Sequence, residues 1–258
     1  MVAASESRND PTTAPQPADL GASLEALGLP RDDLLRQLDL YRSLLIEWNR
    51  RQNLTAITDP AEIDRRLFLD AVRMLPLLND QLAGQTSPHL VDIGSGAGFP
   101  ALPLKMARPT LQTTLIEATG KKVRFLCHVI DELGLTGIRA IHGRAEDLGH
   151  DPVHRGAYDI ATARAVASLP ALLELSFPLL KVGGQALFPK GPDLEEELAA
   201  GRRAATILGG RIDGVTTIVA GQTCLVRATK TAPTPLRYPR RPGIPAREPV
   251  GRSRGHQS

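Results

Sequence analysis

One segment constrains the fold of this chain more than any other: Val91-Asp92-Ile93-Gly94-Ser95-Gly96-Ala97-Gly98-Phe99-Pro100. A short apolar run leads into it and a helix-forming stretch follows, which predicts that a buried strand turns directly into a helix here. The glycines allow the backbone to turn tightly and to approach a ligand, while the first turn of the helix presents unpaired amide groups. Such loops are typical of nucleotide-binding α/β proteins with a parallel sheet.

The rest of the chain agrees with this fold class. From Pro88 onward short apolar runs alternate with helical segments, which predicts βαβ units and a mainly parallel sheet. The predicted strands are 89–93, 112–117, 138–142, 158–163, 184–189, 211–219 and 223–229, and the predicted helices are 99–107, 120–134, 144–149, 168–181 and 192–208. Only three residues separate the last two strands, so we expect a seven-stranded mixed sheet with a reversed hairpin at one edge.

The two ends of the chain differ from this central domain. Residues 1–24 are rich in Ala, Ser, Thr and Pro without periodicity, which predicts a disordered tail. Apolar residues recur every three or four positions over 32–49 and 60–82, which predicts two helices in an N-terminal helical appendage over 25–86. The α/β domain is then expected over 87–230, followed by a basic C-terminal tail over 231–258. We expect both tails to be disordered.

Composition excludes several classes of protein. With 258 residues, of which 42% are hydrophobic, the chain can bury a core without disulfides or a structural metal. Its two cysteines, Cys127 and Cys224, match no metal or redox spacing, so no metal site is expected. The chain contains no 18-residue uncharged run and no recognisable secretion signal, which predicts no membrane span and a cytoplasmic location.

The charge is unevenly distributed. The net charge is +3, but residues 230–258 hold seven cations and a single acid. A local basic segment attracts phosphate backbones, which indicates a nucleic acid as partner, although a solubilising tail is the alternative interpretation.

The spacing inside the glycine loop discriminates between ligands. A dinucleotide fingerprint, G-x-G-x-x-G, requires glycine where this chain has Phe99. The loop instead resembles the first motif of the class I methyltransferases, which bind S-adenosylmethionine. That resemblance implies that Gly94, Gly96 and Gly98 admit the methionine part of the cofactor and that Asp92 lies near its amino group.

Two further acids follow in the order that this cofactor requires. Glu117 ends the second predicted strand, where a carboxylate can accept hydrogen bonds from both ribose hydroxyls. Glu146 follows the third predicted strand, where an acid and a backbone amide can meet the adenine edge. Each acid alone could be a solvated strand end or a helix cap. The ordered set of three predicts a Rossmann-like class I S-adenosylmethionine-dependent methyltransferase domain.

Other segments narrow the resemblance to one family. The stretch from Trp48 to Ile57, WNRRQNLTAI, resembles the WN-x-x-x-NLT signature of the RsmG family, also called glucose-inhibited division protein B. The likeness continues in segments 68–70, 92–100, 120–126, 164–169, 190–191 and 237–246. Members of that family methylate N7 of guanine 527 in 16S ribosomal RNA. The resemblance therefore implies S-adenosylmethionine as cofactor, and 16S rRNA or the small ribosomal subunit as partner of a monomeric enzyme.

The resemblance also carries roles onto individual residues. It places Gly94, Phe99, Ala145, Glu146 and Arg164 at the cofactor, and Arg164 at the end of the fourth strand is also expected to position the substrate. We expect the RNA phosphates to meet basic side chains outside the cofactor loop, namely Lys190, Arg237, Arg240 and Arg241. One position departs from the family, because Leu67 stands where its members usually carry histidine.

The implied chemistry needs little acid–base machinery. Guanine N7 has an in-plane lone pair and no proton at neutral pH, so positioning rather than a general base is expected to drive the reaction. Arg164 is accordingly the single catalytic candidate, and its alternative interpretation is a surface ion pair. Other functions remain open at this point: a methyltransferase for a protein or small molecule, a non-catalytic rRNA-binding assembly factor, or, more remotely, a dehydrogenase.

Overall fold

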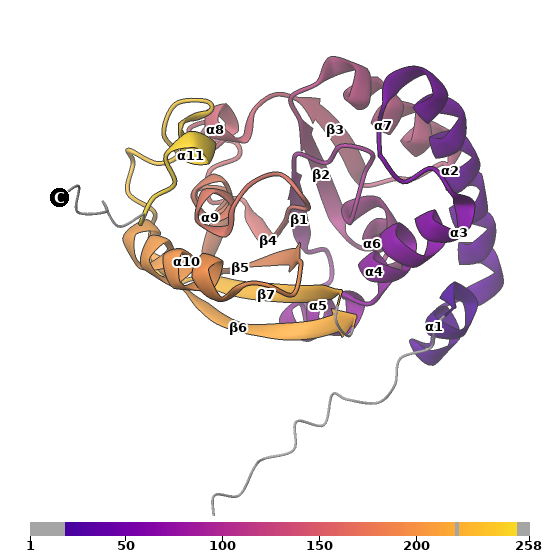
Figure 1. Ribbon diagram of the computed structural model, residues 1–258, viewed down its shortest axis with the longest axis horizontal. Helices are drawn as coiled ribbons and strands as arrows, with labels where there is room; N and C mark the ends of the chain where they lie inside the picture. The colour runs from indigo at the N-terminus through magenta and orange to yellow at the C-terminus, as the bar shows by residue number, and fades with distance from the viewer. Residues whose placement is uncertain (1–18, 220–221, 252–258) are drawn as a thin grey trace, which may run out of the picture.

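A single seven-stranded sheet organises the molecule (Figure 1), and the computed structural model describes residues 19–219 and 222–251. The strands are β1 (His89–Ile93), β2 (Gln112–Glu117), β3 (Ile138–His142), β4 (Tyr158–Thr162), β5 (Leu180–Lys190), β6 (Gly210–Val219) and β7 (Thr223–Lys230). Their order is β3-β2-β1-β4-β5-β7-β6; β1 to β5 are parallel, and β7 is antiparallel to both β5 and β6. The predicted mixed sheet with a reversed edge hairpin is confirmed.

Helices cover both faces of the sheet (Figure 1). One face carries α1 (Leu20–Ala26), α2 (Arg31–Gln52), α3 (Pro60–Ile63), the π-helical turn η1 (Asp64–Phe68), α4 (Leu69–Val72), α5 (Leu75–Gln81), α6 (Ala101–Ala107) and α7 (Gly120–Glu132). The other carries α8 (Ala145–Leu148), α9 (Leu169–Ser176), α10 (Glu195–Leu208) and α11 (Ile244–Arg247). Successive strand residues point to opposite faces, so Leu90 packs in the first core and Val91 in the second.

The strand order reverses between β1 and β4, and β1 pairs in parallel with β2 on one side and with β4 on the other. Asp92 of β1 lies opposite Leu115 of β2 on one side and Thr162 of β4 on the other. In open parallel sheets, ligands bind beyond the carboxyl ends of the strands at such a switch point. The glycine loop leaves β1 at this edge, and the loop after β4 leaves it beside the glycine loop.

The N-terminal region differs from its prediction in two respects. Residues 19–24, expected to be disordered, begin α1: the Asp19 carboxylate caps Ala22 N–H at 2.9 Å, and Leu20 and Leu24 are buried. The helix expected over 60–82 is interrupted at residues 73–74, because Pro76 has no amide to bond the preceding turn and its ring would clash there. The α1–α5 helices share one core with the sheet instead of forming a separate lobe.

The C-terminal region is also ordered further than expected. Residues 231–251, predicted to be a disordered basic tail, run back over α8 and α9 (Figure 1). Tyr238 and Val250 of this segment are buried in the second core. We call this segment the C-terminal strap. Residues 1–18 and 252–258 of the two predicted tails lie outside the described residues.

Two observations bear on membrane spans and on disulfides. In the described ranges no helix is long and apolar enough to cross a membrane. Cys127 and Cys224 are both free thiols.

Candidate active site

The amides of the glycine loop are bonded inside the chain. Gly94 N–H and Ser95 N–H donate to the Ile116 carbonyl at 2.8 and 3.1 Å, and Gly98 N–H donates to the Ser95 carbonyl at 2.6 Å. Gly96 N–H donates to the Glu117 carboxylate at 2.9 Å. A pyrophosphate site needs such amides pointing at the ligand, and a carboxylate in their place repels a second anion. The loop is therefore unsuited to a dinucleotide, which removes the basis of the dehydrogenase hypothesis.

Glycine is required in this loop by both conformation and space. The backbone is left-handed at Gly94, Gly96 and Gly98, with φ of 65°, 59° and 97°. A Cβ on Gly98 would lie 2.6 Å from the Tyr41 hydroxyl and 2.3 Å from a methyl of Leu102. A side chain at position 98 would thus be strained in its backbone and would also displace two buried neighbours.

Tyr41 supports the loop from α2. Its hydroxyl donates a hydrogen bond to the Ala97 carbonyl, and its ring stacks on Phe99 with centroids 5.3 Å apart. Tyr41 is fully buried, and burial raises its pKa well above the ordinary value, so the hydroxyl stays protonated as a donor. In the sequence Tyr41 is one of the apolar-face residues of the helix predicted over 32–49, and nothing local to α2 indicates that the glycine loop lies beside it.

Asp92 lies beneath the loop with one oxygen unsatisfied. Thr162 donates to its Oδ1 at 2.7 Å, whereas its buried Oδ2 has no hydrogen-bond partner. Burial raises the Asp92 pKa to about 7; the hydrogen bonds of Thr162 and Ser95 oppose this rise, and the nearby Glu117 carboxylate adds to it. A ligand that brings a cationic donor to Oδ2 would satisfy this atom and favour the ionised form.

Glu117 closes the other side of the loop. Its two oxygens accept from the backbone N–H groups of Gly96 and Thr119, at 2.9 and 2.8 Å. These two bonds hold the carboxylate at the end of β2. Because an ionised carboxylate has about four acceptor positions, each oxygen can still accept from a ligand hydroxyl.

The third acid has an unexpected partner. Ala145 and Glu146 begin α8 immediately after β3, and both are buried. Glu146 Oε1 accepts the backbone N–H of Gly243, in the C-terminal strap, at 2.9 Å. The strap thus reaches the predicted adenine position, which no spacing in the sequence indicates.

Arg164 follows β4 beside the loop. Its guanidinium donates to the Arg66 carbonyl at 2.7 Å and lies 3.7 Å from the Asp70 carboxylate, which also accepts from Thr223 at 3.2 Å. Burial raises the pKa of Asp70, and Arg164 opposes that rise. Both side chains are largely buried, so this ion pair is not the surface pair of the alternative interpretation.

The loop after β4 also touches the glycine loop. Val166 in this loop lies where a Cβ on Gly94 would be, at 2.8 Å. Ala165, between Arg164 and Val166, has the left-handed φ of 54° that is uncommon outside glycine. The backbone here is held in a strained conformation at the mouth of the site.

Two of the cations predicted to contact RNA have carboxylate partners inside the protein. Lys190 pairs with Glu197 at 2.7 Å and donates to the Ala167 carbonyl at 2.9 Å. Arg240 pairs with the fully buried Glu174 at 2.7 Å. Because these partners compensate the charges of both cations, Lys190 and Arg240 are less available to a phosphate than exposed arginines are. Arg237 and Arg241 are exposed, as the prediction requires.

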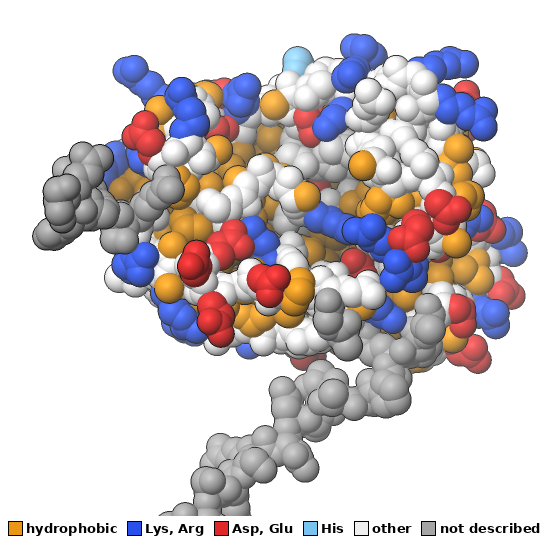
Figure 2. Space-filling model, viewed as in Figure 1, with side chains coloured by type: hydrophobic (Ala, Val, Ile, Leu, Met, Phe, Trp, Pro, Cys, Tyr) orange, Lys and Arg blue, Asp and Glu red, His pale blue; other side chains and the backbone are white. Residues whose placement is uncertain are grey.

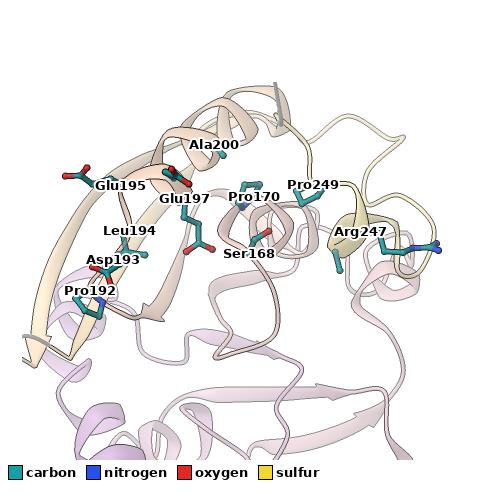
Figure 3. Close-up of a pocket in the computed structure, with 12 residues that line it drawn as sticks. Ser168, Pro170, Pro192, Asp193, Leu194, Glu195, Glu197, Ala200, Arg247 and Pro249 are labelled. Carbon is teal, nitrogen blue, oxygen red and sulfur yellow. The ribbon is translucent and has the colours of Figure 1, made fainter. Parts of the chain in front are cut away.

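A groove of about 860 Å³ opens beside the strap, between α9, the start of α10 and α11 (Figure 3). Its wall on α10 is acidic, with Glu195, Glu196 and Glu197 in the first turn, and Arg247 points away from it (Figure 3). Acidic side chains gather over α10, whereas Lys and Arg side chains gather near the middle of this face (Figure 2). The groove is electrostatically unsuited to a polyanion.

Other sequence features have structural roles. Asn49 Oδ1 accepts from the amides of Leu54 and Thr55 at 2.6 and 2.9 Å, so it holds the turn after α2. Trp48 packs against Phe125, with ring centroids 5.5 Å apart. Leu67 is buried in the core, while the neighbouring Arg66 is exposed and binds Arg164 through its carbonyl.

The site fits S-adenosylmethionine by the chemistry of its donors and acceptors. The unsatisfied oxygen of Asp92 suits the ammonium group of the cofactor, the carboxylate of Glu117 suits ribose hydroxyls, and a sulfonium cation suits a loop flanked by two acids. Over the described ranges, no three His, Cys, Asp or Glu side chains are grouped so that they could hold a metal ion. The strand order and this loop define a class I S-adenosylmethionine-dependent methyltransferase.

Comparisons with known proteins identify the family. The model of the family "GidB: rRNA small subunit methyltransferase G" matches residues 34–226. The chain is 49% identical to the ribosomal RNA small subunit methyltransferase G of Chloroflexus aggregans, over 87% of this chain and 94% of that protein. It is 45% identical to the protein of the same name from Roseiflexus castenholzii, over 84% and 92%. The chain belongs to the rRNA small subunit methyltransferase G family.

A solved structure is also similar, the SAM-dependent methyltransferase from Aquifex aeolicus. It is 20% identical, with a TM-score of 0.47 over 67% of this chain and 94% of that one. The fold assignment rests on the strand order and not on this likeness.

Proposed function

We propose that this enzyme transfers a methyl group from S-adenosylmethionine to N7 of guanine 527 in 16S rRNA. The observation that carries the proposal is the position of Arg164, whose loop touches the glycine loop through Val166 and Gly94. We assign a cation held at this point to contact with the approaching base. Membership in the rRNA methyltransferase family supports RNA as the substrate.

We assign the cofactor to residues at the carboxyl ends of β1, β2 and β3. Gly94, Gly96, Gly98 and Phe99 form the loop over its methionine part, and Asp92 accepts from its amino group. Glu117 accepts from the ribose hydroxyls, and Ala145 and Glu146 meet the adenine. When bound, S-adenosylmethionine supplies an electrophilic methyl group on a sulfonium ion.

The enzyme's own contribution is positioning. Guanine N7 needs no deprotonation, and among the described residues no histidine hydrogen-bonds the glycine loop. His89 begins β1 at the opposite end of the strands, and the remaining four bond or stack with other partners: His128 with Trp48, His142 with the Ala118 carbonyl, His150 with the Pro239 carbonyl and His154 with Tyr158. Correct alignment of the reacting atoms can lower the barrier by roughly 7–11 kcal/mol.

Arg164 is the residue assigned to this alignment. Asp70 and the Arg66 carbonyl restrain its guanidinium from two directions. A restrained guanidinium can donate to the guanine O6 or to a flanking phosphate without losing much side-chain entropy on binding. Since N7 lies in a deep, narrow groove of paired RNA, the target guanine must be unpaired or extruded.

Exposed cations are assigned to the RNA backbone. Arg66 on η1 has a side chain 53% exposed and only a distant pairing, 3.8 Å, with Glu62. Arg237 and Arg241 on the strap are exposed as well. Phosphate contacts from these side chains would position the RNA without reading its sequence. We place the reaction in the cytoplasm, on the small subunit or its RNA, and assign it to a monomer.

The test is a methyl-transfer assay with labelled S-adenosylmethionine and small ribosomal subunits from cells that lack the gene. The expected product is a single N7-methylguanine, mapped by chemical cleavage of the RNA chain at that base. The Arg164→Gln variant should lose methyl transfer far more than it loses cofactor affinity, because its main assigned contact is with the substrate base. Subunits from wild-type cells, already modified, are the matched substrate control.

Other outcomes would reassign the function. Cofactor binding without transfer to RNA would favour a protein or small-molecule substrate. Absence of cofactor binding would favour a non-catalytic assembly factor. Label on a different guanine, or on another atom of guanine, would leave an rRNA methyltransferase but refute the assigned target.

A further inference from the structure

The C-terminal strap is fastened to the body by polar contacts from α8 and the loop that follows it. The Arg155 guanidinium donates to the carbonyls of Thr234 and Tyr238, at 2.8 and 2.9 Å. The His150 ring bonds the Pro239 carbonyl at 2.7 Å. The basic C-terminal segment is therefore held against the body of the protein between Thr234 and Pro239. A solvated RNA-binding arm would lack such contacts.

Arg240 makes the strongest of these attachments. Glu174, in α9, is fully buried, and its carboxylate accepts three hydrogen bonds from Arg240: from the backbone N–H at 2.9 Å, from Nε at 2.8 Å and from Nη2 at 2.7 Å. The same guanidinium donates to the Glu248 carbonyl at 2.6 Å, further along the strap. A buried carboxylate is tolerated only with such partners, so removal of Arg240 leaves an uncompensated charge in the core.

Three residues after Arg240 the strap meets the cofactor site. Gly243 has the left-handed φ of 82°, which turns the chain so that its N–H donates to Glu146 Oε1 at 2.9 Å. Glu146 is buried at the start of α8, directly after β3. One hydrogen bond therefore connects the strap to the acid assigned to the adenine.

We propose that Arg240 is a positioning residue for the cofactor: by docking the strap on Glu174 it holds the Gly243 N–H on Glu146 and so fixes the adenine side of the site. The inference rests on the proposed placement of adenine at Ala145 and Glu146. The proposal gives two adjacent arginines of the strap different roles. Arg240 points inward and positions the cofactor site, whereas its exposed neighbour Arg241 is assigned to the RNA.

The division of roles makes the proposal testable with paired variants of the full chain. Arg240→Met removes the guanidinium charge together with its paired hydrogen bonds to Glu174. Arg241→Met removes one charge from an exposed position of the same strap. Cofactor dissociation constants are measured directly, with S-adenosylmethionine and with S-adenosylhomocysteine in the absence of RNA. Turnover and the KM for small subunits are measured separately at saturating cofactor.

For Arg240→Met we expect a cofactor dissociation constant raised by about ten-fold or more, with kcat at saturating cofactor within about two-fold of wild type. For Arg241→Met we expect the opposite split: cofactor affinity within about two-fold of wild type and a raised KM for subunits. Hydrogen exchange of the α8 amides, measured without added cofactor, should be faster in Arg240→Met only.

A purely structural role would give a different result. It would lower the free energy of unfolding while leaving cofactor affinity and α8 exchange unchanged at a temperature where the variant is folded, and this result would overturn the proposal. If Arg240→Met does not fold, Arg240→Lys retains the charge but not the paired guanidinium hydrogen bonds to Glu174. Faster exchange of the α8 amides in that variant with an unchanged cofactor affinity would equally refute the inference. Failure of the wild-type protein to bind the cofactor would instead refute the proposed cofactor site.

Discussion

Asp92 provides a quantitative test of the site, because its carboxyl is buried and only half satisfied. Its pKa is raised from 3.8 to about 7, mainly by burial. Between those two values the folded protein binds a proton that the unfolded chain has released, so the free energy of unfolding falls as pH rises. The loss of unfolding free energy caused by ionising the buried Asp92 is absent below pH 3.8, grows between pH 3.8 and pH 7, and is complete above pH 7. At about 1.4 kcal/mol per pH unit it amounts to about 4 kcal/mol.

The Asp92→Asn variant removes this penalty with almost no change in shape. An asparagine amide cannot ionise, but its NH₂ in place of the unpartnered Oδ2 would be a buried donor without an acceptor, at a cost of about 1–3 kcal/mol at every pH. We therefore expect the variant to be more stable than wild type by about 1–3 kcal/mol at pH 8 without added cofactor. We also expect it to bind S-adenosylmethionine about ten-fold or more weakly, because the carboxylate no longer accepts from the ammonium group.

The assay is urea unfolding of both proteins, followed by far-ultraviolet circular dichroism from pH 5 to pH 9. Only Asp92 differs between them, so the difference in their free energies of unfolding isolates its titration. That difference should rise by about 2 kcal/mol from pH 5 to pH 7 in favour of the variant, and by only about 0.4 kcal/mol more up to pH 9. Thr162→Val removes a hydrogen bond to the ionised form, so the rise should continue to higher pH in that background.

A stability difference that stayed constant between pH 5 and pH 7 would refute the reasoning, since Asp92 would then ionise alike in the folded and unfolded chains. Unchanged cofactor affinity in Asp92→Asn would refute the assigned contact with the amino group but not the titration.

Three further predictions concern the loop and its neighbours. Tyr41→Phe leaves a buried loop carbonyl without its donor and should lower the free energy of unfolding by about 1–3 kcal/mol; an unchanged urea midpoint would contradict the assigned hydrogen bond. Gly98→Ala should destabilise the protein far more than Gly96→Ala, because both backbones are left-handed but a Cβ meets crowding atoms only at position 98; equal losses in thermal unfolding would show that backbone strain alone matters. Asp70→Asn removes the charge that restrains Arg164 and should lower kcat by about ten-fold with cofactor affinity unchanged; a loss confined to cofactor binding would contradict the substrate-side role.

Much of the sheet could be read from local patterns. The three strands 89–93, 112–117 and 138–142 have the bounds that their apolar runs predict, and the hairpin lies at the edge that its short turn indicates. The glycine loop and the acids Asp92, Glu117 and Glu146 gather at one end of the sheet because parallel strands bring their carboxyl ends together. These features depend on residues close in sequence, or on a topology that the βαβ rhythm already dictates.

Composition alone misplaces residues that carry a local signal. The composition of residues 1–24 predicts a disordered tail, although Asp19 followed by Leu20 and Leu24 is a capped helical pattern. In the helix predicted over 60–82, Pro76 indicated the break that the structure shows.

The sequence by itself determined the fold class, the glycine loop and the acids Asp92, Glu117 and Glu146 at the ends of the first three strands. Each of these features is specified by periodicity or spacing along the chain. Only the tertiary structure decided that Tyr41 supports the loop, that Thr162 satisfies one oxygen of Asp92, and that of two adjacent arginines Arg240 points inward and Arg241 outward. Positive charge along the chain does not specify the direction of a side chain. That direction is set by the buried carboxylate of Glu174, 66 residues away in sequence, because a buried charge is stable only with a partner.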